Sequence, residues 1–204
     1  MSKSKGLWLG PWRDRIDSPV SLDWTSVKIK VLGVFIGPGN LEVDNWRPRI
    51  LAVENVLCSW KQCILSFKGR ALVINTLALS RVWYVASLIY MPAWVLGELS
   101  KPVFYFFWKG KRDLVSCPVV VQHLLVGGFS VVDVKLKVQS LLVQWVKRYL
   151  LSTSAWSVFC EFWFHSLYNS SPYDVFSAPF CFSPVGLSPF YRSLILAWRA
   201  VDGS

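Results

Sequence analysis

The chain has 204 residues and 53% of them are apolar, so it can bury a sizeable core and is not expected to be disordered. It carries 22 Lys and Arg against 12 Asp and Glu, a net charge of +10 that suits nucleic acid or an anionic membrane surface. Segment 1–17 lacks the apolar core of a secretory signal because Gly10, Pro11 and Arg13 interrupt it, so an intracellular protein (cytoplasm or nucleus) is expected.

The first forty residues predict little regular structure. Segment 2–24 is basic, rich in Trp and broken by Pro and Gly, which indicates a loop with one short strand near Gly6–Leu9. Segment 28–37 reads KIKVLGVFIG and alternates, with Lys28 and Lys30 leading into an apolar face. By periodicity alone this stretch predicts one strand, ended by the turn residues PGN.

Helical periodicity begins at Asp44. Apolar side chains then recur at intervals of four, three, four and three residues, at Trp46, Ile50, Val53, Leu57 and Trp60. This spacing predicts a helix that buries all five, with Asp44 or Asn45 as its N-cap. We therefore expect Trp46 and Trp60 to belong to the core and not to a base-stacking surface.

Further helices follow along the chain. They are expected at 71–90, where Met91 and Pro92 stop the helix, at 93–108, in a long segment starting near Asp133, and at 155–167 and 189–201. Segment 111–129 predicts a strand or an irregular connection. The fold class is therefore mainly α with a small β portion, with short N-terminal strands or a hairpin before the helices.

The mean hydropathy of +0.40 raises the question of a membrane span. Segment 71–96 has the length to cross a bilayer, but it contains Asn75, Arg81 and Pro92. We do not expect it to cross, and a membrane-associated helical protein without enzymatic activity is kept as the alternative.

The cysteines predict neither a disulfide framework nor a zinc site. They stand at Cys58, Cys63, Cys117, Cys160 and Cys181, with no C-x-x-C pair and only two histidines in the chain. Free buried thiols are expected, and no metal, cofactor or small-molecule substrate. Catalysis has no candidate residues either, because no Asp-Asp or Asp-x-Asp pair and no phosphate-binding loop occurs.

Binding has better support, since segment 55–112 is strongly basic. Its bases are Lys61, Lys68, Arg70, Arg81, Lys101, Lys109, Lys111 and Arg112, against the single acid Glu98, so eight minus one leaves +7. Lys68 and Arg70 bracket Gly69 before an expected helix start, where backbone N–H groups favour phosphate. The alternatives are a solvated basic face, or for Arg81 a pair with Glu54 or Glu98.

Several ordered motifs resemble one family. They are SKSKGLWLG, KIKVLGVFIG, NWRPRI, LSFKGRALVINTLALSRVWYVASL, FFWKGKRDLV, VGGFSVVDVKLKVQSLLVQWVKRYL and FYRSLILAWRAV. Together they resemble the C-terminal part of a non-LTR (LINE-type) retrotransposon reverse transcriptase, over nearly the whole chain. The resemblance implies a palm edge and primer-grip remnant at 1–43, a thumb-like helical domain at 44–112 and a helical extension at 113–204.

The resemblance also implies roles for single residues. Lys3, or Lys5 in a competing alignment, falls where a palm lysine lies near the incoming nucleotide, and KIKVLGVFIG falls at the primer-grip hairpin. Mg²⁺ would be needed only by a catalytic palm, whose carboxylates this sequence lacks. We therefore expect a truncated copy that binds an RNA/DNA duplex weakly, or folds poorly. The expected nucleic-acid contacts are Lys3, Lys28, Lys30, Lys68, Arg70 and Arg81.

Overall fold

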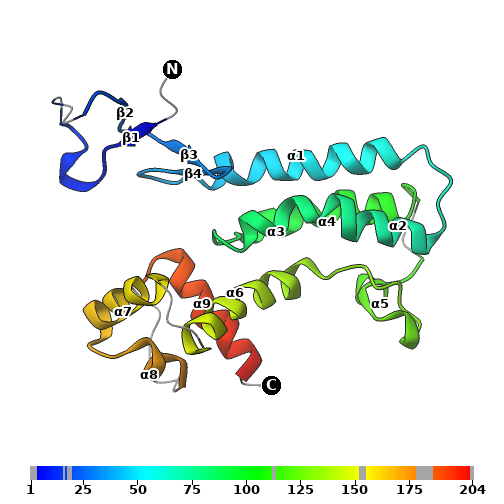
Figure 1. Ribbon diagram of the computed structural model, residues 1–204. Coiled ribbons are helices and arrows are strands. Elements are labelled where there is room, and N and C mark those ends of the chain that lie inside the picture. Colours follow the sequence, from blue (N-terminus) through cyan, green and yellow to red (C-terminus); the bar gives the residue numbers. More distant parts are fainter. Residues whose placement is uncertain are drawn as a thin grey trace.

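The computed structural model describes residues 4–15, 17, 20–111, 114–151, 155–177 and 186–202. It is mainly helical, with two small sheets near the N-terminus, and the predicted fold class is confirmed (Figure 1). Lys3 lies outside the described residues, and so do Arg112 and Cys181.

Each sheet has two strands of three residues. Strand β1 (Lys5–Leu7) pairs in parallel with β2 (Asp23–Thr25), and β3 (Ile29–Val31) pairs antiparallel with β4 (Val34–Ile36). A short 3₁₀ helix, η1 (Gly10–Trp12), lies in the connection between β1 and β2. The rings of Trp8 and Trp24 stack on the first sheet with their centroids 4.2 Å apart.

The single strand predicted over 28–37 is wrong, because the chain folds back in its middle. Leu32 and Gly33 both have left-handed backbone angles, with φ of 49° and 85°, as a tight two-residue hairpin turn requires. Leu32 continues the alternation of apolar residues, so the pattern hides the turn. The hairpin that the family resemblance implies at this position is present.

Helix α1 (Glu42–Trp60) is the longest element of the first half of the chain. Its predicted seam is confirmed at four positions, since Trp46, Ile50, Val53 and Leu57 are buried. Trp60 was expected in the core, but it is the last residue of the helix, lines a pocket there and has 37% of its surface exposed. The helix begins earlier than predicted, and Leu41, not Asp44 or Asn45, occupies the N-cap position.

The segment predicted as one helix over 71–90 is interrupted. It consists of α2 (Phe67–Val73), a π-helical turn η2 (Ile74–Ala78) and α3 (Ser80–Ala86), which run back along α1 (Figure 1). It starts earlier because Ser66 caps it, its Oγ accepting the Gly69 N–H at 3.2 Å. Helix α4 (Ala93–Phe107) then packs against α1, close to its predicted bounds.

The π-helical turn aims Asn75 at a distant part of the chain. The amide of Asn75 donates to the Ser130 carbonyl at 2.8 Å and accepts the Val132 N–H at 2.9 Å. This pair of bonds fixes the connection after α4, which contains the short helices α5 (Cys117–Val121) and η3 (Leu124–Val126). Of the two alternatives predicted for segment 111–129, a strand or an irregular connection, the structure has the irregular connection.

The last part of the described chain contains four helices. They are α6 (Val134–Leu151), α7 (Ala155–Tyr168), α8 (Pro172–Ser177) and α9 (Pro189–Asp202). Asp133 begins α6 as predicted, because its Oδ1 accepts the Leu136 N–H at 3.0 Å. Helix α8 was not predicted, and α6 and α9 lie against each other (Figure 1).

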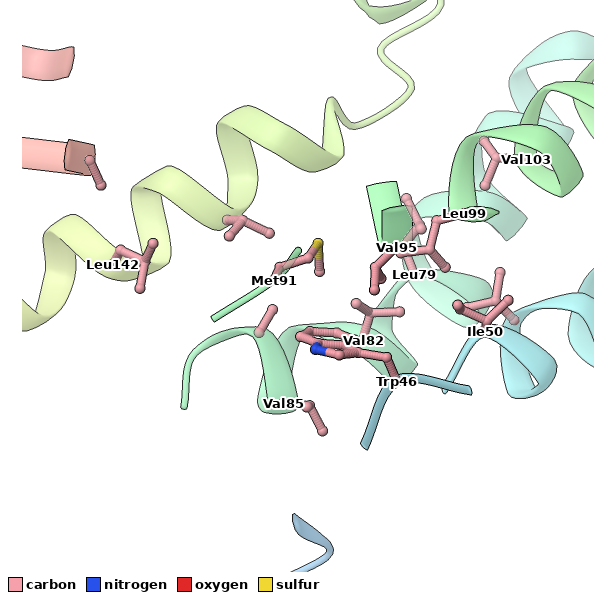
Figure 2. Close-up of a cluster of buried hydrophobic side chains, with 14 of the residues drawn as sticks. Trp46, Ile50, Leu79, Val82, Val85, Met91, Val95, Leu99, Val103 and Leu142 are labelled. Carbon is pink, nitrogen blue, oxygen red and sulfur yellow. The ribbon is translucent and has the colours of Figure 1, made fainter. Parts of the chain in front are cut away.

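One contiguous apolar core joins these helices. Figure 2 shows the indole of Trp46 among Val82, Val85 and Met91, with side chains of α4 alongside. The Trp46 Nε1–H also donates to the Tyr90 carbonyl at 3.2 Å, just after α3. Among the described helices, none is long and apolar enough to span a bilayer.

Candidate nucleic-acid interface

The β3–β4 hairpin is attached to the first turns of α1 by two polar side chains. The Asn45 amide accepts the Phe35 N–H at 2.7 Å and donates to the Phe35 carbonyl at 3.0 Å. One turn later, Arg49 Nη2 donates to the Gly33 carbonyl at 2.9 Å. Because residues four apart share a helix face, both side chains reach the hairpin and hold it in one orientation.

Lys28 and Lys30 come together at the base of this hairpin. Their Nζ atoms lie 5.2 Å and 5.4 Å from the centre of the Phe35 ring. Lys28 also forms an ion pair with Asp44 in the first turn of α1, whereas the side chain of Lys30 is exposed. The positive charge of Lys28 is therefore partly offset, and that of Lys30 is directed to solvent.

Lys68 and Arg70 are two residues apart on α2 and have different surroundings. Lys68 is exposed, but Arg70 is buried, with only 8% of its surface accessible. The Arg70 guanidinium donates to the Leu65 carbonyl through Nε and Nη2, and to the Phe107 carbonyl through Nη1. Burial lowers the pKa of Arg70 from its ordinary value. Its donors therefore serve the packing of α2 against α4.

The backbone N–H groups near Gly69 are also used within the chain. Lys68, Gly69 and Arg70 lie inside the first turns of α2, which begins at Phe67. The Gly69 N–H is already bonded to Ser66 Oγ, and the Arg70 N–H to the Ser66 carbonyl. Of the features expected to bind phosphate here, the exposed amine of Lys68 is the one that faces solvent.

Arg81 lies exposed at the start of α3. The acid proposed as its partner, Glu98, is instead within 3.8 Å of Arg47 and 3.1 Å of Lys101. Within the described ranges no ion pair links Arg81 to Glu54 or to Glu98. Its charge remains available at the surface.

The exposed bases are spread along the α1–α3 layer and do not form one cluster. Helix α1 has 19 residues, so the hairpin and α2 lie about 28 Å apart at its two ends (Figure 1). The return path through α2, η2 and α3 brings Arg81 about 20 Å back from Lys68 toward the hairpin. Such spacing suits an extended polyanion better than a single phosphate group.

A second set of residues, which sequence reasoning did not bring together, forms a pocket at the C-terminal end of α1. Its volume is about 310 Å³, and its walls include Trp60, Lys61, Tyr105 and Lys109. Lys61 Nζ lies 5.1 Å from the centre of the Tyr105 ring and 3.4 Å from its hydroxyl. Lys61 and Tyr105 are 44 residues apart, and only the packing of α1 on α4 makes them neighbours.

The thiols differ from the expectation of buried cysteines. Cys58, Cys63 and Cys117 are exposed and Cys160 is buried, and all four are free. Cys58 and Cys63 are among the residues that line the pocket. No group of three His, Cys, Asp or Glu residues in the described part of the chain is placed to hold a metal ion.

Comparison with known proteins gives a relation to mobile elements. No protein-family model matches the chain. It is 29% identical, over 215 aligned positions, to the "Transposon TX1 uncharacterized 149 kDa protein" of Xenopus laevis. The chain is a distant relative of this transposon protein. The alignment covers 98% of the chain but 16% of the transposon protein, so the chain spans about a sixth of its relative's length.

Proposed function

We propose that this chain is the primer-grip, thumb and following helical part of a retrotransposon RNA-directed DNA polymerase. In this proposal it binds the duplex of template and primer and does not polymerise DNA by itself. The main support is the similarity to a transposon protein over 98% of the chain, because it extends through all the motifs that resemble the polymerase family.

The arrangement of the hairpin supports the first half of this proposal. Asn45 and Arg49 fix its backbone to α1, so Lys28 and Lys30 are presented from a rigid base. A rigid base loses little conformational entropy when a strand end is bound. In the proposal this hairpin holds one end of a strand, while Lys68 and Arg81 contact the phosphate backbone farther along.

These contacts would be electrostatic and independent of base sequence. Lysine and arginine bound to phosphates displace condensed counterions, and the logarithm of the affinity falls by about 0.9 per contact for each tenfold rise in salt. Four contacts, from Lys28, Lys30, Lys68 and Arg81, predict a slope of about −3.6. Arg70 is not included, because its donors are already bonded to backbone carbonyls.

Duplex binding can be measured by fluorescence anisotropy with a labelled RNA/DNA duplex at 50 mM and 200 mM salt. The fourfold rise in salt should lower affinity by about 10²-fold. The variant Lys28→Gln/Lys30→Gln/Lys68→Gln/Arg81→Gln should lose most of the binding and of its salt dependence. Absence of binding at low salt would overturn the proposal.

A charge-matched control separates specific contacts from net charge. The variant Lys135→Gln/Lys137→Gln/Lys147→Gln/Arg192→Gln removes four exposed positive charges from α6 and α9. It changes the net charge equally but should retain most of the affinity. If both variants lose the same duplex affinity, the bases beside the hairpin and on α2 and α3 contribute only through the net charge.

Catalysis is not expected from this chain alone. Two-metal phosphoryl transfer needs carboxylates that hold both ions, and the sequence has no Asp-Asp or Asp-x-Asp pair. A primer-extension assay with Mg²⁺, template and nucleotides should therefore yield no product. Template-dependent extension would contradict this part of the proposal. The place of Lys3 near an incoming nucleotide stays a prediction from the family resemblance.

A further inference from the structure

The pocket at the end of α1 has aromatic and apolar walls. Trp60 and Leu57 come from α1, and Tyr105 and Phe106 from α4 on the facing side. Its volume of about 310 Å³ is at the lower end of the range of small-molecule sites. A flat ring of nucleobase size matches such walls, because every base has a π-face that stacks on aromatic side chains.

The rim of the pocket is positively charged. Lys61 and Lys109 are both exposed there, and Glu54 is the acid among the lining residues. Lys109 follows α4 with a left-handed backbone, at a φ of 55°. This conformation ends α4, because the Lys109 N–H donates to the Phe106 carbonyl at 3.2 Å and the Gly110 N–H to the Tyr105 carbonyl at 2.8 Å. An anionic group attached to the bound ring would meet both amines.

A simpler interpretation is that these lysines only offset the carbonyl ends of α1 and α4, which carry partial negative charge. The position of Arg70 argues against it. Arg70 also lines the pocket, and its buried guanidinium already donates to the Phe107 carbonyl at the end of α4 and to Leu65 beyond α1. The negative potential at the end of α4 is thus partly neutralised from inside, which leaves the rim lysines to act on a ligand.

From these contacts we infer that the pocket receives one unstacked nucleotide of a single strand, with its base against the aromatic walls that include Trp60 and Tyr105, and its phosphate at Lys61 and Lys109. The inference rests on the proposed function and adds a single-strand site to it. The pocket lies about 28 Å from the hairpin, the length of about eight base pairs at 3.4 Å each. A strand that extends beyond a duplex of this length reaches the pocket.

The test compares three labelled ligands: a blunt duplex, the same duplex with a four-nucleotide overhang, and one with an abasic overhang. The abasic overhang has the same phosphates and lacks only the bases. The base-containing overhang should bind about 5- to 150-fold more tightly than the abasic one. Equal affinities for the two overhangs would overturn the inference, while binding of the blunt duplex would still support the proposed function.

Variants assign the effect to the pocket. Trp60→Ala/Tyr105→Ala should abolish the difference between the two overhangs, and both positions are exposed enough to leave the fold intact. Tyr84→Ala removes an exposed ring outside this pocket, so the difference in affinity between the two overhangs should remain. A difference that survives in the double variant would also overturn the inference.

The two proposals can fail separately. A single-stranded oligonucleotide and its abasic counterpart test the pocket without a duplex. If the oligonucleotide binds more tightly than its abasic form while the blunt duplex does not bind, the pocket is confirmed and duplex binding is wrong. If the base-containing and abasic ligands bind equally well, both as overhangs and as single strands, the pocket inference is wrong.

Discussion

The first helical region (α1 to α4) packs rings where α2 meets α4, with the Phe67 and Phe107 centroids 5.4 Å apart, but along α1 it differs from the second helical region (α6 to α9). Along α1 the first region is mostly aliphatic around Trp46, and single polar side chains join its elements. The second region packs ring on ring, as in Trp145 with Trp156 and Phe164 with Phe176, whose centroids are 5.1 Å and 5.6 Å apart.

The regions also differ in what their polar groups do. In the first region, the side chains of Arg70 and Asn45 are buried and hydrogen-bond to backbone groups of the chain. The side chains of Lys68 and Arg81 are exposed to solvent. In the second region the buried polar groups include the Cys160 thiol and the Ser193 hydroxyl, which donates to the Phe190 carbonyl at 2.6 Å. On α2, a buried base that holds the packing and an exposed base that is proposed to bind nucleic acid are thus only two residues apart. Substitutions there should separate stability from binding.

The largest expected effect is at the centre of the first region. Trp46→Ala removes a fully buried ring and its bond to Tyr90, and should cost about 3–5 kcal/mol of unfolding free energy. Denaturant unfolding followed by circular dichroism measures this. Trp60→Ala, at the exposed end of the same seam, should cost less than about 1 kcal/mol. Similar losses would show that the seam is not buried as described.

The next effect separates two bases of one helix. Arg70→Met leaves the Leu65 and Phe107 carbonyls without their donor, which should cost about 1–3 kcal/mol. Lys68→Met should change stability by less than about 0.5 kcal/mol but lower the salt slope of duplex binding by about 1. The reverse pattern, with Arg70 needed for binding and Lys68 for stability, would contradict the different roles assigned to them.

A pH-dependent effect belongs to the second region. Burial raises the pKa of Cys160 from 9.0 to about 12, with a smaller contribution from Glu161. The folded protein thus keeps a proton that the unfolded chain releases above pH 9, so this stability is complete below pH 9 and is lost as the pH rises toward 12.

At pH 10 the loss from Cys160 should reach about 1.4 kcal/mol relative to pH 8. Burial first, and then Glu161, which accepts its hydroxyl hydrogen bond at 3.2 Å, raise the pKa of Tyr149 to about 12, so it adds to the decline above pH 10. Denaturant unfolding at pH 8, 9 and 10 measures the effect. In Cys160→Ala the unfolding free energy should fall less steeply between pH 8 and 10. If it falls as steeply as in the unaltered protein, groups other than Cys160 cause the decline.

The smallest effect is at the hairpin base. Lys28 and Asp44 are both partly exposed, so Lys28→Gln should change stability by about 1 kcal/mol or less. The same variant should lower the salt slope of duplex binding by about 1. Asp44→Asn should instead strengthen duplex binding at low salt, because it releases the Lys28 amine. Weaker binding of Asp44→Asn would mean that the ion pair positions Lys28 for its contact.

Periodicity was sufficient for the helices whose buried face is local in sequence. The seam of α1, the bounds of α4 and the start of α6 at Asp133 follow from spacing, Pro92 and a capping side chain. Each depends on neighbours within a few residues, so the sequence alone contains the information. The same holds for the positive net charge and for the ordered motifs that resemble a retroelement polymerase.

Tertiary structure decided which polar residues were available. Asn45 was expected to cap a helix, but it binds the hairpin backbone ten residues earlier. Asn75 reaches Ser130 from a π-helical turn that no spacing predicts. Arg70 and Lys68 are equivalent in the sequence, and only the approach of α4 buries one of them. The contacts of Arg70 with Phe107 and of Asn75 with Ser130 join residues 37 and 55 positions apart, so they depend on helix packing, which local patterns do not encode.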